Sequence, residues 1–157
     1  GEIPSLVGTR KENEAGTIAA FLHDALIRER ASLGCAAIFC PSKWDCHSVA
    51  NALPARLRAR VMESRELDLD HDGVKVMTMH AAKGLQFPVV VVARMDRGRF
   101  PSKPAPGIAP EVHEQQSRRV LFVACSRAMR RLMVVHTAGK PSPLLEGLDD
   151  GAWIVEP

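Results

Sequence analysis

The sequence lacks several features that would place it directly in a class of protein. No apolar run approaches the roughly 20 residues of a transmembrane helix. No basic segment followed by an apolar one resembles a signal peptide. The pattern G-x-x-x-x-G-K-[ST] is absent, so the sequence holds no phosphate-binding loop of that type. We therefore expect a cytoplasmic protein with no membrane partner.

Cysteine is scarce and does not follow a paired zinc spacing. The four cysteines are Cys35, Cys40, Cys46 and Cys125. Cys40, Cys46 and His47 could in principle share a metal ion. However, Cys35 and Cys40 bracket an apolar run and are typical of small core residues. We expect reduced thiols and no metal site.

The net charge of the 157 residues is only +3, but the charge is unevenly distributed. Residues 1–73 carry 9 Lys and Arg against 11 Asp and Glu, and residues 74–93 contain two lysines and no acid. Residues 94–140 carry 10 basic and 3 acidic residues, whereas residues 141–157 have a net charge of −4. The basic segment fits contact with a polyanion. A solvated face with a basic loop explains it equally well.

The first half of the chain predicts strands alternating with helices. An expected strand at Pro4–Gly8 precedes a helix whose buried stripe holds Ile18, Leu22, Ala25 and Leu26. The apolar run Cys35–Cys40 predicts a central parallel strand. Ser42 and Asp45 resemble a capping box that begins a second helix, with Cys46, Val49, Ala50 and Leu53 inside and Pro54 at its end. Arg60–Met62 is expected to be a short edge strand.

The second half continues this pattern. We expect strands at Val74–Met79, Val89–Val92 and, as the last strand, Arg131–Val135. A helix is expected at Val112–Ala128, with Val120, Leu121, Ala124, Cys125 and Ala128 buried. Residues 96–110 are rich in Pro and Gly and predict a mobile loop, and residues 146–157 a C-terminal tail. The order of elements predicts a single α/β domain over residues 1–157, with helices on both faces of a parallel sheet.

Polar residues follow the strand at Val74–Met79. Ligands of open α/β sheets bind outside the carboxyl ends of strands, which is where Thr78, His80 and Lys83 are expected. Gly84 permits close approach of the backbone to a partner. Taken singly, His80 is more often a structural histidine and Lys83 a surface charge.

As a string, residues 76–88 resemble motif V of UvrD/Rep-type helicases, T-x-H-x-A-K-G-L-E-F. The resemblance implies that Thr78 and His80 contact single-stranded DNA, with Lys83 and Gly84 shaping the loop. It also implies that Gln86 contacts the nucleotide ribose. The family usually has Glu there, and Gln keeps a hydrogen bond but loses the charge.

Residues 117–128 resemble motif VI of the same family, E-E-R-R-L-x-Y-V-A-x-T-R-A. The resemblance implies that Arg119 binds nucleotide and that Arg127 is the catalytic arginine finger on the γ-phosphate. The two arginines lie eight residues apart, about 80° around an ideal helix, so both can border one surface. Ser126 and Phe122 replace Thr and Tyr of the pattern, and the acidic pair before the arginines is largely lost.

Together the resemblances imply a RecA-like second motor domain without a P-loop. They imply ATP and Mg²⁺ as cofactors of a longer protein, DNA as a partner, and an N-terminal Walker A domain that completes the ATP site. We expect this chain alone to bind neither cofactor and to be inactive. The alternatives are a helicase-nuclease subunit of a recombination complex and a non-enzymatic interaction module derived from this fold.

Overall fold

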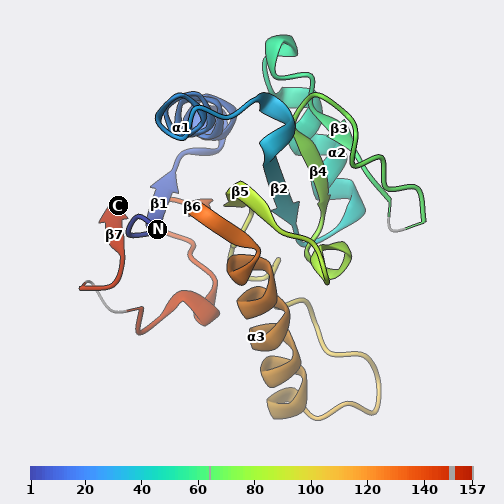
Figure 1. Cartoon of the computed structure of the whole chain (residues 1–157). Coiled ribbons are helices and arrows are strands. Elements are labelled where there is room, and N and C mark those ends of the chain that lie inside the picture. The colour runs from blue at the N-terminus through green and yellow to red at the C-terminus, as the bar shows by residue number, and fades with distance from the viewer. Residues whose placement is uncertain (64, 149–150, 157) are drawn as a thin grey trace.

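The computed structural model describes residues 1–63, 65–148 and 151–156. Across these residues, seven strands form one sheet in the order β3-β4-β2-β5-β6-β1-β7 (Figure 1). All neighbouring strands run parallel. The parallel α/β sheet that the sequence predicts is confirmed.

The elements begin and end close to the predicted positions. The strands are β1 (Ser5–Thr9), β2 (Ala36–Cys40), β3 (Arg60–Val61), β4 (Lys75–Thr78), β5 (Phe87–Val92), β6 (Ala128–Thr137) and β7 (Ile154–Glu156). The α-helices are α1 (Glu14–Arg28), α2 (Lys43–Ala52) and α3 (Pro110–Ser126). Short 3₁₀ turns are η1 (Lys11–Asn13), η2 (Leu33–Cys35), η3 (Ala55–Leu57), η4 (Met79–Ala82) and η5 (Pro143–Leu145). None of the helices in the described residues combines the length and apolar character needed to cross a membrane.

Both faces of the sheet are covered by helices, as predicted (Figure 1). On one face, α1 and α2 pack against alternate strand residues such as Ile38 and Val91. On the other face, α3 and η4 cover the residues between them, such as Phe39 and Val90. Successive side chains of a strand point to opposite faces, so β2 and β5 must be apolar throughout to serve two cores.

Three details of the expected elements are corrected by the structure. Ala128 is the first residue of β6 and not part of the helix. Val120, Leu121 and Cys125 are only partly buried, because one side of α3 faces solvent. The last strand is β7, which extends the sheet by pairing with β1. The tail predicted from residue 146 onward therefore contains a strand.

Strand β4 holds a buried charge, Lys75, which is 2% exposed. Its ammonium group donates to the backbone carbonyls of Gly34 at 2.8 Å and His71 at 2.9 Å. A buried charge is tolerated when hydrogen bonds replace its hydration. Lys75 thus ties the segment before β2 to the segment before β4.

Residues 96–109 contain no helix or strand, apart from a single bridge between Asp96 and Pro141, and Pro110, the last residue of the predicted loop, already begins α3. The beginning of this loop is anchored, because Phe100 is buried and the Asp96 carboxylate accepts hydrogen bonds from the Thr137 backbone and hydroxyl. The mobility of the remainder stays a prediction.

Close packing before β4 makes Gly73 a test of the fold. A Cβ at Gly73 would lie 2.2 Å from the Arg58 carbonyl oxygen, whereas one at Gly16 in α1 would meet nothing within 4 Å. We expect Gly73→Ala to lower the free energy of unfolding by about 1–3 kcal/mol. Gly16→Ala should raise it by roughly 0.5–1 kcal/mol, because alanine costs less backbone entropy in a helix. Urea unfolding of both variants measures the difference, and equal stability would show that Gly73 is not tightly packed.

Candidate functional site

The segment between β4 and β5 contains both buried residues and exposed polar residues. The Thr78 hydroxyl accepts a hydrogen bond from the Ala81 N–H at 3.4 Å and caps η4. Met79, Ala81 and Ala82 are buried, so the turn is held against the sheet. His80, Lys83, Gly84 and Gln86 remain exposed. The segment therefore presents its polar residues to solvent from a fixed backbone.

Gly84 has a specific backbone requirement. Its φ of +83° lies in the left-handed region that favours glycine, and nothing lies within 4 Å of a Cβ built there. Space alone would admit a side chain, so the conformation is the reason for glycine. This turn directs the chain toward the start of β5.

Helix α3 packs on this segment and adds a cation to it. Arg119 is exposed and, together with His80 and Lys83, lines a cavity of about 270 Å³ whose remaining walls are Met79, Val120 and Val123. Two stretches about 40 residues apart in the sequence therefore meet at one surface. The sequence patterns predicted these residues singly, and the fold brings them together.

Arg127 lies at a different place from Arg119. It follows the last residue of α3, and its carbonyl accepts a hydrogen bond from the Phe87 N–H at 2.9 Å. Its guanidinium bonds back to the Val123 carbonyl and the Ser126 hydroxyl. Eight residues of helix separate the two arginines by about 12 Å along the axis. Arg127 thus lies beside Gln86 and Phe87, and is not among the residues lining the cavity of Arg119.

Three of the predicted site residues carry positive charge without a carboxylate partner. Within the described part of the chain, Lys83, Arg119 and Arg127 form no ion pair, whereas Arg118 pairs with Glu114 at 2.8 Å. Cations that lack a carboxylate partner are available to an anionic ligand. The arrangement fits phosphate groups of a nucleotide or of a nucleic acid.

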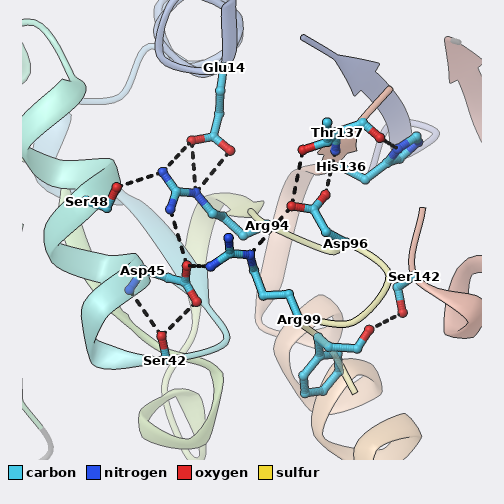
Figure 2. Close-up of polar contacts among 11 residues, drawn as sticks. Glu14, Ser42, Asp45, Ser48, Arg94, Asp96, Arg99, His136, Thr137 and Ser142 are labelled. Carbon is cyan, nitrogen blue, oxygen red and sulfur yellow. Dashed lines mark hydrogen bonds and ion pairs between the residues drawn. The ribbon is translucent and has the colours of Figure 1, made fainter. Parts of the chain in front are cut away.

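A buried ion network at the carboxyl end of β5 was not predicted from the sequence (Figure 2). Arg94 is 6% exposed, and its guanidinium donates to Glu14 of α1, and to Asp45 and Ser48 of α2. Arg99 of the following loop also donates to Asp45, so this carboxylate lies between two guanidinium groups. The network joins two helices to the loop.

Electrostatics inside the network favour the charged arginine. Burial lowers the pKa of Arg94, but hydrogen bonds and charges from Glu14 and Asp45 outweigh this and raise the pKa above its usual value. Asp45 is also the residue that donates its N–H to the Ser42 hydroxyl, at 3.1 Å, in the predicted capping box. The Asp45 carboxylate accepts a hydrogen bond from the same hydroxyl at 2.7 Å, so one carboxylate serves both the start of α2 and the network.

Two of the cysteines, Cys40 and Cys125, have thiols that resist ionisation. No group of three His, Cys, Asp or Glu residues in the described ranges could hold a metal ion. A hydrogen bond to Cys46, together with burial, raises the pKa of Cys40 well above its usual value. Burial raises the pKa of Cys125 to about 12. A thiol with so high a pKa is not ionised at neutral pH and is a poor nucleophile.

The family model of the UvrD-like helicase C-terminal domain matches residues 47–139, which is more than half of the chain. The chain belongs to this family. The matched range includes both candidate segments of this helicase domain.

Curated relatives are similar over part of the chain. A probable DNA helicase II homolog from Rickettsia conorii is 36% identical over 81 residues, covering 51% of this chain and 12% of the relative. The ATP-dependent DNA helicase PcrA from Staphylococcus aureus is 36% identical over 80 residues, covering 51% of this chain and 11% of the relative. The aligned part of this helicase domain therefore spans only about a tenth of these proteins.

A solved structure matches the fold over the whole chain. The C-terminal domain of a possible DNA helicase from Lactobacillus plantarum WCFS1 superposes with a TM-score of 0.77 at 24% sequence identity. The match covers 100% of this chain and 87% of the other. The RecA-like class of fold expected from the sequence is confirmed.

The ion network gives a prediction on stability. Asp45→Asn keeps the size of the side chain but removes a charge that is 2% exposed between two arginines. We expect the free energy of unfolding to fall by about 3 kcal/mol, the lower end for a broken buried ion pair, because Arg94 loses one of its two carboxylate partners and keeps Glu14. The control is Asp24→Asn, since the Asp24–Arg28 pair is exposed and should contribute less than about 1 kcal/mol. Similar losses in denaturant unfolding of the two variants would contradict a structural role of the network.

Proposed function

We propose that this domain is the second motor domain of an ATP-dependent DNA helicase. It supplies DNA contacts and an arginine finger to an ATP site completed by an N-terminal Walker A domain of the same longer protein. The observation that carries the proposal is the packing of two segments, Thr78–Gln86 and Arg119–Arg127, on one face of the sheet. A single rigid unit can then respond to both nucleotide and DNA.

The nucleotide contacts in this proposal come from Gly84, Gln86, Arg119 and Arg127. Arg127 and Gln86 lie near the amino end of β5, joined through the Phe87–Arg127 hydrogen bond. A guanidinium is planar and permanently charged, which suits the charge that develops on a transferring phosphoryl group. Arg127 needs only to exchange its bonds to Val123 and Ser126 for a phosphate oxygen.

In this proposal, Mg²⁺ is bound by the Walker A domain and not by the residues of this chain. ATP is the substrate, and Mg²⁺ would neutralise charge on its phosphates when bound. The described residues offer no acidic cluster for a metal ion, and the sequence has no phosphate-binding loop. In this proposal, the Walker A domain therefore supplies both the metal ligands and the phosphate-binding loop. This division is why we propose that the chain is inactive by itself.

The DNA contacts in this proposal are Thr78, His80 and Lys83. Thr78 ends β4, so it lies at the carboxyl edge of the sheet, and its hydroxyl fixes the turn that carries the other two. His80 and Lys83 are exposed and flank the same cavity. We propose single-stranded or duplex DNA as the ligand, a cytoplasmic location and a role in DNA repair. The unpaired cations favour this motor role over an interaction module without enzymatic function.

Arg127 tests the catalytic part of the proposal. In the longer protein, Arg127→Ala should lower DNA-stimulated ATP turnover by roughly 10³–10⁵-fold while changing nucleotide affinity little, because the contact strengthens in the transition state. Arg127→Lys should restore turnover only in part, since it keeps the charge but loses the planar fork. The measurement is steady-state ATPase activity with saturating single-stranded DNA, and thermal melts check folding.

Arg130 is the matched control, because it is exposed and lies three residues away in β6. Arg130→Ala should retain nearly normal turnover. Comparable losses in Arg127→Ala and Arg130→Ala, or normal turnover in Arg127→Ala, would show that Arg127 is not the arginine finger.

His80 tests the DNA part of the proposal. His80→Ala in the longer protein should weaken DNA binding and reduce the stimulation of ATPase activity by DNA, while basal turnover without DNA is kept. The side chain is exposed, so its removal should leave the melting temperature unchanged. If DNA-stimulated turnover of His80→Ala equalled that of the unchanged protein, His80 would have only a structural role.

A further inference from the structure

Trp44, on the first turn of α2, is an exposed tryptophan. Its side chain is 63% exposed, although tryptophan is usually well buried. It lies outside residues 47–139, the range that the family model matches. An indole this exposed is available to a ligand.

Two arginines contact the indole ring. The guanidinium carbons of Arg94 and Arg99 each lie 5.8 Å from the centre of the Trp44 ring. Both guanidinium groups are fixed by Asp45, as Figure 2 shows for the arginines. The ring is therefore oriented before any ligand binds, and its exposed surface remains free for stacking.

The same two arginines border a basic cleft of about 500 Å³. The cleft is lined by Lys11, Glu14, Arg94, Asp96, Arg97, Gly98, Arg99, Thr137 and Lys140. Its carboxylates are already engaged, Glu14 by Arg94, and Asp96 by Arg99 and Thr137. The side chains of Lys11, Arg97 and Lys140 form no ion pair or hydrogen bond with any described residue. The free charge of the cleft is therefore positive.

Thr78, Trp44 and the basic cleft lie in this order along the carboxyl edge of the sheet. Thr78 of β4 is level with Cys40 of β2, and Trp44 follows Cys40 by four residues. The cleft then lies beyond the carboxyl ends of β5, β6 and β1, the next strands in order. Four strand spacings of about 4.8 Å make this path about 19 Å long.

We propose that Trp44 is a stacking platform for a base of single-stranded DNA, and that the basic cleft binds the adjoining phosphodiester backbone. A basic groove beside an exposed aromatic ring is the combination that binds single strands without sequence preference. The inference rests on the proposed function, since it extends the DNA path that begins at Thr78 and His80. It adds Trp44, Lys11, Arg97 and Lys140 to that path.

Fluorescence of the 157-residue chain tests the stacking. The sequence has two tryptophans, so Trp153→Phe leaves Trp44 as the only indole. Oligothymidylate at low salt should quench its emission, whereas an abasic oligonucleotide of equal length should bind without quenching. Trp44→Ala should weaken oligothymidylate binding roughly 5- to 150-fold, and Trp44→Phe should weaken it less. Thermal melts of each variant check folding.

The salt dependence of binding tests the cleft. Arg97→Gln with Lys140→Gln should lower the slope of log affinity against log salt by about 1.4, from about 0.7 per phosphate contact on a single strand. Arg30→Gln with Arg56→Gln is the control of equal charge, because these residues line a separate pocket with Leu33 and Leu57. The control should leave the slope unchanged.

Several results would overturn the inference. These are no binding at low salt, binding that leaves Trp44 emission unchanged, or wild-type affinity in Trp44→Ala. Quenching by thymidine monophosphate as strong as by the oligonucleotide would instead indicate a mononucleotide site. A quench by the oligonucleotide together with normal ATPase activity in Arg127→Ala would keep this DNA site and reject the motor role.

Discussion

The buried guanidinium of Arg94 is the interaction on which the carboxyl edge of this domain depends. Its backbone adopts φ = +63°, a conformation that costs a non-glycine residue energy and persists only when its surroundings fix it. Glu14, Asp45 and Ser48 provide that fixation from two helices. Arg94 thereby sets how α1, α2 and the loop after β5 meet.

The contacts of Arg94 also explain how the polar carboxyl edge of the sheet can be rigid. In the described residues, no buried side-chain nitrogen or oxygen lacks a hydrogen-bond partner. Asp45 bonds to the Ser42 cap of α2 and pairs with Arg94 and Arg99, the two arginines that contact the ring of Trp44. Groups that are fixed before a ligand arrives lose less entropy when they bind it. On the other face of the sheet, where α3 packs on η4, Lys83 and Arg119 form no ion pair with any described residue.

Much of the fold could be predicted from local sequence. Apolar runs identified β2 and β5, because a strand buried on both faces must be apolar throughout. The Ser42 cap could be predicted because it is a contact over three residues. The strand β7 was missed, since three exposed residues at an edge carry no periodic signal.

The candidate site was predictable only in part. The two motif-like segments indicated Thr78, His80, Lys83 and the arginines, but a helical wheel could not show that Arg119 and Arg127 lie at different ends of the site. The partners of Arg94 lie 80 and 49 residues away in the sequence, and the basic cleft joins three separate segments. Such contacts depend on strand order, which local patterns do not determine.

In the proposal developed above, the carboxyl edge of the sheet binds single-stranded DNA. Nuclear magnetic resonance of the ¹⁵N-labelled chain, titrated with oligothymidylate at low salt, tests it directly. The account predicts that amide shifts concentrate at residues 42–45, 78–83 and 96–99. Amides near Leu33 and Leu57, which line a pocket away from that edge, should stay unchanged. Shifts concentrated around Leu33 and Leu57, or spread evenly over the chain, would contradict the claim.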